Sequence, residues 1–193
     1  MQEKTVNYEL RRTLLHLSIP LTLLIALIPH SQYIYLGIFV LLFISETIRL
    51  RSKRYHSFLM KLPIVRSLMR KEEKRQMFAA TGLTLGLAVT SALLPIRLFC
   101  LSIITLTLAD PSGRIMGKRF GKRKICEGNP KTLVGFCTVW AVSSVLFSLF
   151  GLSPVHVVTD SFIVAYMEAF SRHKPFFFDD NAIIPISLAL IWM

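Results

Sequence analysis

The sequence predicts an all-α integral membrane protein with about seven transmembrane helices, organised as a single domain over residues 1–193. The first observation is composition: 53% of the residues are hydrophobic and 18% are charged, with a mean hydropathy of +0.54. The second is that the 23 Lys and Arg residues gather in a few segments between apolar runs. Disorder is excluded, because it requires low hydrophobicity. The net charge of +12 would suit a nucleic-acid binder in a polar chain, but the apolar average argues against a soluble one, so no nucleic-acid partner is expected.

Seven apolar runs are candidate spans, since a full crossing takes about 17–25 mostly apolar residues. The first run is followed at once by the second, so we interpret it as a retained anchor rather than a cleaved signal peptide. Pro20 and Pro185 lie inside runs and predict kinks. The last run is short for a complete crossing. The predicted spans are residues 13–29, 33–48, 77–94, 96–109, 132–150, 155–170 and 182–193.

Orientation follows from the distribution of positive charge. Of the 23 Lys and Arg residues, 22 lie on one side of the predicted spans, in the leader and in segments 49–76, 110–131 and 171–181. The remaining one, Arg97, lies on the other side. Because cytoplasmic loops carry an excess of positive charge, the N-terminus and the three basic loops are expected in the cytoplasm and the C-terminus outside.

The 49–76 segment is a basic cytoplasmic or interfacial loop. Its stretch 55–70 mixes apolar and basic side chains. This pattern is compatible with an interfacial helix that breaks near Pro63 and lies on anionic headgroups. It is about equally compatible with a plain basic linker.

The richest candidate for chemistry is the Gly-, Lys- and Arg-rich segment 110–131, interpreted as a nucleotide loop. Asp110 is expected at a helix end, where its carboxylate can hold Mg²⁺ together with substrate phosphates. Gly113, Gly117 and Gly121 recur every four residues, and in a helix they would form a bare stripe at which a phosphate chain approaches the backbone. The alternative is a positive-inside loop with flexible glycines.

A second cluster lies between the sixth and seventh predicted spans. Glu168 ends one span and Asp180-Asn181 begins the next, so two facing helix ends would bring their oxygen atoms to the same surface. Such oxygens suit Mg²⁺, or one carboxylate can accept a proton from a hydroxyl group. Asp180 has an alternative role as the N-cap of the last helix, with Asp179 as its neighbour.

The order of these residues, and their placement at cytoplasmic helix ends, resemble those of the CTP-dependent membrane lipid kinases. This family comprises dolichol (polyprenol) kinase, phytol kinase and the yeast-type diacylglycerol kinase, and the resemblance runs over most of the chain. Two positions depart from the family: Thr13 stands where Lys is usual, and Val134 stands where Glu usually precedes the aligned glycine. The matching residues are Glu9, Arg12, His16, Glu46, Arg49, Arg70, Glu73, Asp110-Pro111, Gly117, Phe120-Gly121, Lys131-Thr132, Gly135, Glu168, Asp180-Asn181 and Pro185.

The resemblance implies phosphoryl transfer from CTP, or another nucleoside triphosphate, to the hydroxyl of a membrane lipid alcohol, with Mg²⁺ as cofactor. The acceptor would belong to the polyprenol or dolichol, diacylglycerol or phytol class. The implied roles are catalysis by Asp110, Lys131 and Glu168; metal binding by Asp110, Asp180 and Asn181; phosphate binding by Gly113, Gly117, Lys118, Gly121, Lys122, Lys124 and Thr132; and orientation of the lipid or phosphate by Arg12 and His16.

Two alternatives stay open. A phosphatidate cytidylyltransferase-like enzyme would use CTP to form a CDP-lipid and release pyrophosphate. A non-catalytic membrane protein, such as a small transporter or assembly factor, would belong to another class altogether. A transporter is expected to place polar residues near the bilayer midplane, and here only Asp160 and His156 are candidates for that depth.

Overall fold

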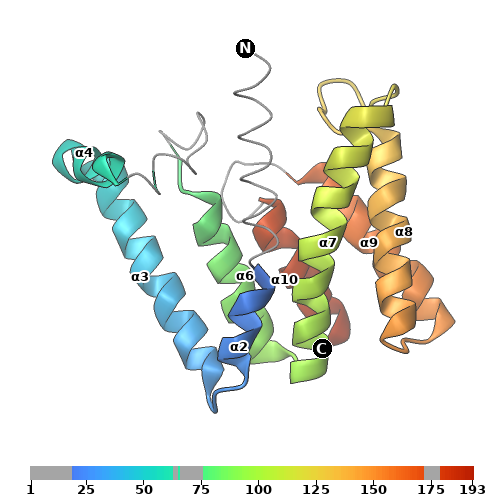
Figure 1. Cartoon of the computed structure of the whole chain (residues 1–193), viewed down its shortest axis with the longest axis horizontal. Coiled ribbons are helices and arrows are strands. Elements are labelled where there is room, and N and C mark those ends of the chain that lie inside the picture. The colour runs from blue at the N-terminus through green and yellow to red at the C-terminus, as the bar shows by residue number, and fades with distance from the viewer. Residues whose placement is uncertain (1–18, 63–64, 66–75, 172–178) are drawn as a thin grey trace.

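The computed structural model describes residues 19–62, 65, 76–171 and 179–193, and over these it is all helical (Figure 1). The predicted all-α class is therefore confirmed for this part of the chain. Several residues of the predicted kinase pattern lie outside the described ranges: Glu9, Arg12, His16, Arg70 and Glu73. The elements are η1 Ile19–Thr22, α2 Leu23–Ala26, α3 Ser31–Arg51, α4 Lys53–Lys61, α6 Ala79–Leu93, α7 Ile96–Phe120, α8 Leu133–Leu149, α9 Pro154–Phe170 and α10 Asp180–Trp192.

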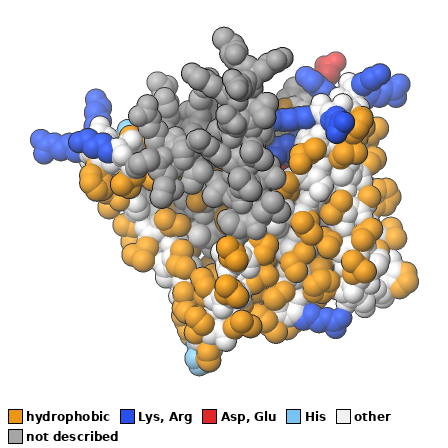
Figure 2. Space-filling model, viewed as in Figure 1, with side chains coloured by type: hydrophobic (Ala, Val, Ile, Leu, Met, Phe, Trp, Pro, Cys, Tyr) orange, Lys and Arg blue, Asp and Glu red, His pale blue; other side chains and the backbone are white. Residues whose placement is uncertain are grey.

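Two helices, α3 and α7, are long and apolar enough to cross a bilayer. The apolar stretch of α3 is only 17% buried, whereas that of α7 is 61% buried. Apolar side chains therefore cover much of the outer face, and Lys and Arg side chains gather mainly at the upper end (Figure 2). Exposed apolar surface of this extent is typical of a protein that contacts lipid or a large partner, so the structure supports membrane association.

The short last helix, α10, lies at the centre of the bundle. It packs against α6, α7 and α9, while α8 packs between α7 and α9 and α3 packs on α6 (Figure 1). Ala182, Ile184, Leu188 and Ala189 of α10 are fully buried. The helix can therefore be short because neighbouring helices cover it.

A buried ion pair fastens the end of α3 to the start of α6. Arg49 donates from Nε to Glu46 Oε1 (2.9 Å) and from Nη2 to Glu46 Oε2 (2.8 Å), and Arg49 Nη2 also donates to the Gln76 carbonyl. The backbone N–H of Phe78 donates to Glu46 Oε2 (3.0 Å), and the guanidinium lies 4.2 Å from the centre of the Phe78 ring. Such a two-pronged Arg–carboxylate pair fixes both distance and direction.

Part of the basic segment is helical, because α4 covers residues 53–61. Ser52, in an extended conformation, ends α3 and accepts a hydrogen bond from the Tyr55 N–H at 3.3 Å, which starts α4. The chain turns sharply here, so α4 lies across the end of α3 (Figure 1). Phe58 is 58% exposed, and Lys53 and Arg54 are exposed too.

Helix α7 differs most from its prediction. It continues through Pro111 to Phe120, so Asp110 does not lie at a helix end and the connection to α8 is only residues 121–132. The sequence pointed to a loop because proline, glycine and charge disfavour an isolated helix. Packing reverses this preference, because α8 lies directly against Gly113 and Gly117 and stabilises the segment as a helix.

Replacing Gly117 with Val is expected to destabilise the protein by about 1–3 kcal/mol, since overfilling a packed contact forces neighbouring atoms apart. A Cβ atom at Gly117 would lie 2.8 Å from Thr132 Oγ1 and 3.4 Å from Gly135 Cα. Gly37→Val is the matched control, because a Cβ there meets nothing within 4 Å. Thermal unfolding in detergent should show a lowered midpoint for the first variant alone; equal midpoints would contradict the close helix contact.

Candidate functional site

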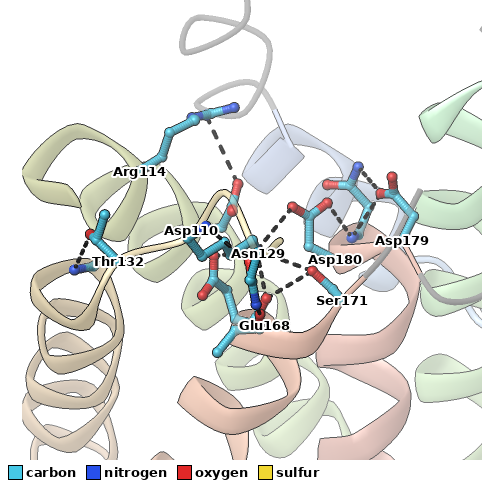
Figure 3. Close-up of polar contacts among 12 residues, drawn as sticks. Asp110, Arg114, Asn129, Thr132, Glu168, Ser171, Asp179 and Asp180 are labelled. Atoms are coloured by element: carbon cyan, nitrogen blue, oxygen red, sulfur yellow. Dashed lines mark hydrogen bonds and ion pairs between the residues drawn. The ribbon is translucent and has the colours of Figure 1, made fainter. Parts of the chain in front are cut away.

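The centre of the candidate site is the ammonium group of Lys131, in the connection between α7 and α8. Its Nζ donates to Glu168 Oε1 (2.5 Å), to the Glu168 carbonyl oxygen (2.5 Å) and to Ser171 Oγ (3.0 Å). Asp180 Oδ2 lies 3.9 Å from the same Nζ. Figure 3 shows Glu168, Ser171 and Asp180 around this point. One cation therefore joins the end of α9 to the first residue of α10.

Asn129 holds the connection in place. Its Nδ2 donates to the Ala169 carbonyl (2.8 Å), and its Oδ1 accepts from the Lys131 N–H (2.9 Å). Gly128 precedes it with φ +79°, a left-handed conformation that glycine adopts without strain. The last carbonyl groups of a helix have no partner within it, so Asn129 and Lys131 together satisfy the end of α9.

The start of α10 is arranged by Asp179. Its Oδ1 accepts hydrogen bonds from the Asn181 N–H (3.1 Å) and from Asn181 Nδ2 (2.8 Å). The helix cap is therefore Asp179 and not Asp180, which corrects the alternative role considered for Asp180. Because its Nδ2 is committed to Asp179, the Asn181 side chain has a defined orientation. Its Oδ1 is buried and has no hydrogen-bond partner in the described part of the chain.

Asp110 reaches the same cluster from α7. Its side chain is 2% exposed, and the charges of Asp180, Lys131 and Glu168 all act on it. Figure 3 shows Asp110 beside Glu168 and Asp180. Four predicted site residues, which come from α7, the 121–132 connection, α9 and α10, are thus brought together.

The environment keeps Lys131 protonated. Burial by itself would lower the pKa of the Lys131 ammonium, but the opposite charges of Asp180, Glu168 and Asp110 outweigh it, so the pKa lies above the ordinary value for lysine. A lysine that stays protonated cannot act as a general base. It can neutralise a phosphate group or hold a carboxylate in position.

Three oxygen-bearing side chains of the cluster are of the kind that could take part in holding a magnesium ion. Within the described ranges, no three His, Cys, Asp or Glu side chains are grouped closely enough to hold a metal by themselves. Mg²⁺ commonly uses only one or two carboxylates and takes its other ligands from phosphates and water. Asp110 and Asp180 offer two carboxylates, and the buried Asn181 Oδ1 offers an amide oxygen that no described group uses.

The glycine stripe predicted as a phosphate cradle faces protein instead. A Cβ at Gly113 would lie 3.1 Å from the Gly135 carbonyl oxygen, and one at Gly121 would overlap Thr132. Thr132 is the N-cap of α8, with its Oγ1 accepting from the Gly135 N–H at 3.2 Å. This face of α7 is therefore filled by α8, which leaves no room for a phosphate chain against its backbone.

The other predicted residues lie around the site or away from it. Lys118, Lys122 and Lys124 are exposed near the end of α7, where Figure 2 shows basic side chains. Arg12 and His16 lie outside the described residues. Asp160 and His156 are separate from the Lys131 cluster and form a group of their own near the other end of the bundle.

That second group is held by hydrogen bonds. Asp160 Oδ2 lies 3.2 Å from His156 Nδ1 and accepts from Trp192 Nε1 (2.8 Å), and its Oδ1 accepts from Thr159 Oγ1 (2.9 Å). Trp192 is at the end of α10, so the Asp160 carboxylate ties α9 to α10. This contact accounts for a buried carboxylate that the sequence alone left unexplained.

Three residues of the site were not singled out as functional by sequence reasoning. Asn129 and Ser171 carry the hydrogen bonds around Lys131, and Arg114 lies beside Asp110, with Nη2 3.9 Å from Asp110 Oδ2. The signal for Asn129 was its place before Pro130 in a turn. Arg114 had one available signal, its spacing of four residues from Asp110, which puts both on one helix face.

Comparisons of the chain with protein-family models, with curated proteins and with solved structures find no match in any of the three.

Proposed function

We propose that this protein is a membrane lipid kinase, which transfers a phosphoryl group from a nucleoside triphosphate, with CTP the first candidate, to the hydroxyl of a lipid alcohol. The observation that carries the proposal is the meeting of Asp110, Lys131, Glu168 and Asp180 in one buried cluster. These residues are up to 70 positions apart in the chain, and each stands at the edge of an apolar run. A chance distribution of interfacial charges would not require them to converge.

The proposed setting is a multi-pass protein with about seven spans and its site at the cytoplasmic face. Support comes from the two span-length helices α3 and α7 and from the exposed apolar surface. Lys131 lies in the 121–132 connection that directly follows the basic end of α7. Figure 2 shows basic side chains near the end of α7. Positive charge marks the cytoplasmic side, which is also where nucleotides and Mg²⁺ are available.

Phosphoryl transfer requires the protein to position the two substrates and to neutralise phosphate charge. The lipid oxygen forms a bond to the terminal phosphorus, the bond from that phosphorus to the leaving diphosphate oxygen breaks, and the hydroxyl proton passes to a carboxylate. Glu168 is the proposed proton acceptor and Lys131 the group that neutralises phosphate charge. Mg²⁺, held by Asp110, Asp180 and Asn181, would supply further neutralisation of the triphosphate.

The test is a product assay on the purified protein in detergent. The protein receives γ-labelled CTP or ATP, Mg²⁺ and, in separate reactions, a polyprenol, a diacylglycerol or phytol, and the lipid products are then separated. Label in the lipid fraction is the expected result, and it identifies both donor and acceptor. Pyrophosphate release with phosphatidate as acceptor would instead favour a cytidylyltransferase. A folded sample that is silent in both assays would overturn the proposal.

A further inference from the structure

Arg114 is a largely buried cation, and neither of its terminal nitrogens is hydrogen-bonded to a described residue. Its side chain is 13% exposed, and both Nη1 and Nη2 are buried without a hydrogen-bond partner in the described part of the chain. Its ion-pair contact is with Asp110 Oδ2, at 3.9 Å from Nη2. That distance is too long for a hydrogen bond, so Asp110 balances charge without occupying the donors.

The other buried arginine shows how the fold treats this side chain elsewhere. Arg49 directs Nε and Nη2 to the two oxygens of Glu46 and reaches the Gln76 carbonyl as well. A guanidinium is always charged and carries five N–H donors, and leaving buried donors unpaired is costly. Arg49 is satisfied by neighbouring described residues. The terminal donors of Arg114 have no such partner there, so they are available to a bound ligand.

Two groups of opposite kind, each next to one of the Asp110 and Asp180 residues, have no hydrogen-bond partner among the described residues. Arg114, one helical turn after Asp110, offers donors, and Asn181, directly after Asp180, offers its acceptor Oδ1. A phosphate group supplies acceptor oxygens in the fork geometry that a guanidinium matches. A divalent cation bound to that phosphate supplies the positive partner for an amide oxygen. A cation–phosphate complex therefore satisfies both groups at once.

We infer that Arg114 is a phosphate-binding residue of this site. The inference rests on the proposed function and deepens it, because it moves the phosphate contact from the glycine stripe, which α8 fills, to the face of α7 that carries Asp110 and Arg114. The ligand chemistry is a phosphate group. Its source is either the polyphosphate of the nucleotide or the phosphate of the lipid product.

The experiment measures binding without turnover. Purified protein in detergent is titrated with Mg²⁺–tripolyphosphate and, separately, with a short-chain lipid phosphate, and the shift in thermal unfolding midpoint gives an apparent Kd. The variants are Arg114→Met, which removes the charge, and Arg114→Lys, which keeps the charge and removes the fork. Arg54→Met is the matched control, since that arginine is exposed on α4 and lies outside the 110–131 segment.

We expect Arg114→Met to weaken binding of one probe about ten- to hundredfold, because charge-assisted hydrogen bonds are lost. Arg114→Lys should lie between it and the wild type, and Arg54→Met should match the wild type. If the affinity for tripolyphosphate depends on Arg114, the bound phosphate group belongs to the nucleotide. If only the affinity for the lipid phosphate depends on Arg114, the bound phosphate group belongs to the lipid product. If Arg114→Met does not fold, a weakened Kd in Arg114→Lys decides the question.

Unchanged affinity in the Arg114 variants, or no binding of either probe by the wild type, would overturn the inference. Its failure is separable from failure of the lipid kinase proposal. If phosphate binding depends on Arg114 but the protein labels no lipid, the phosphate-binding inference stands and the lipid kinase proposal fails. If the protein labels lipid but the Arg114 variants bind both probes as tightly as the wild type does, the lipid kinase proposal stands and the Arg114 inference fails.

Discussion

Replacing Asp110 with Asn is expected to abolish phosphoryl transfer while the protein stays folded. The amide has nearly the same shape as the carboxylate but lacks the charge that a magnesium–triphosphate complex needs. Loss of one well-placed charged or polar group commonly lowers the rate about 10²–10³-fold, and loss of a metal ligand is expected to reach at least that range. The measurement is the initial rate of label transfer to the lipid, with the unfolding midpoint recorded in parallel.

Asp160→Asn is the control for this prediction. Asp160 is as buried as Asp110, at 2% exposed, but its oxygens are engaged by Thr159, His156 and Trp192, away from the Lys131 cluster. This variant should lower the unfolding midpoint and leave the rate per folded molecule near the wild-type value. Full activity in Asp110→Asn would remove Asp110 from the site, and equal losses in both variants would indicate a general effect of buried carboxylates.

Lys131→Met is expected to impair both stability and activity. The ammonium group bonds Glu168 and Ser171 and faces Asp180, so its removal leaves partly buried carboxylates without their shared cation. Breaking one partner of a buried pair costs about 3 kcal/mol or more, although Lys131 is 24% exposed and the cost is expected at the lower end. The rate should fall about 10²-fold, because phosphate charge is no longer neutralised.

The double variant Lys131→Met/Glu168→Gln separates the two roles of the lysine. Neutralising Glu168 removes the buried charge that the single variant leaves behind, so the unfolding midpoint should recover in part. Activity should stay lost, because neither phosphate neutralisation nor a proton acceptor returns. Recovery of activity together with stability would mean that Lys131 serves only to close the end of α9.

The helices that coincide with apolar runs in the sequence were predictable. The apolar runs locate α3, α6, α8 and α9 to within a few residues, since each helix is apolar along its length. The course of α7 beyond residue 109 was not predictable, because this part of the helix is stabilised by contact with α8: Gly113 and Gly117 lie against Gly135, which is 22 and 18 positions away in the chain. Pattern reasoning treats Pro111 and the following glycines as helix-breaking, and only the tertiary contact reverses that.

The candidate site divides in the same way. Asp110, Lys131, Glu168 and Asp180 could be selected because an ionisable residue at the edge of an apolar run has few structural reasons to be there. Arg114 could not be told from its basic neighbours, since a cation in a basic segment is normally solvated. Its burial depends on the turn of α7 that carries Asp110, which the sequence placed at a helix end.

The length of α7 has a consequence for the depth at which the chemistry would occur. Asp110 is the fifteenth residue of this helix, so it lies about 21 Å along the axis from the first residue, at 1.5 Å per residue. The hydrocarbon layer is about 30 Å thick. If α7 begins at the outer boundary, as the positive-inside rule predicts from the position of Arg97, the Asp110 carboxylate would lie beneath the headgroups of the opposite leaflet. The acceptor hydroxyl could then react without rising into water, and lipids with a large polar headgroup would be excluded by depth alone.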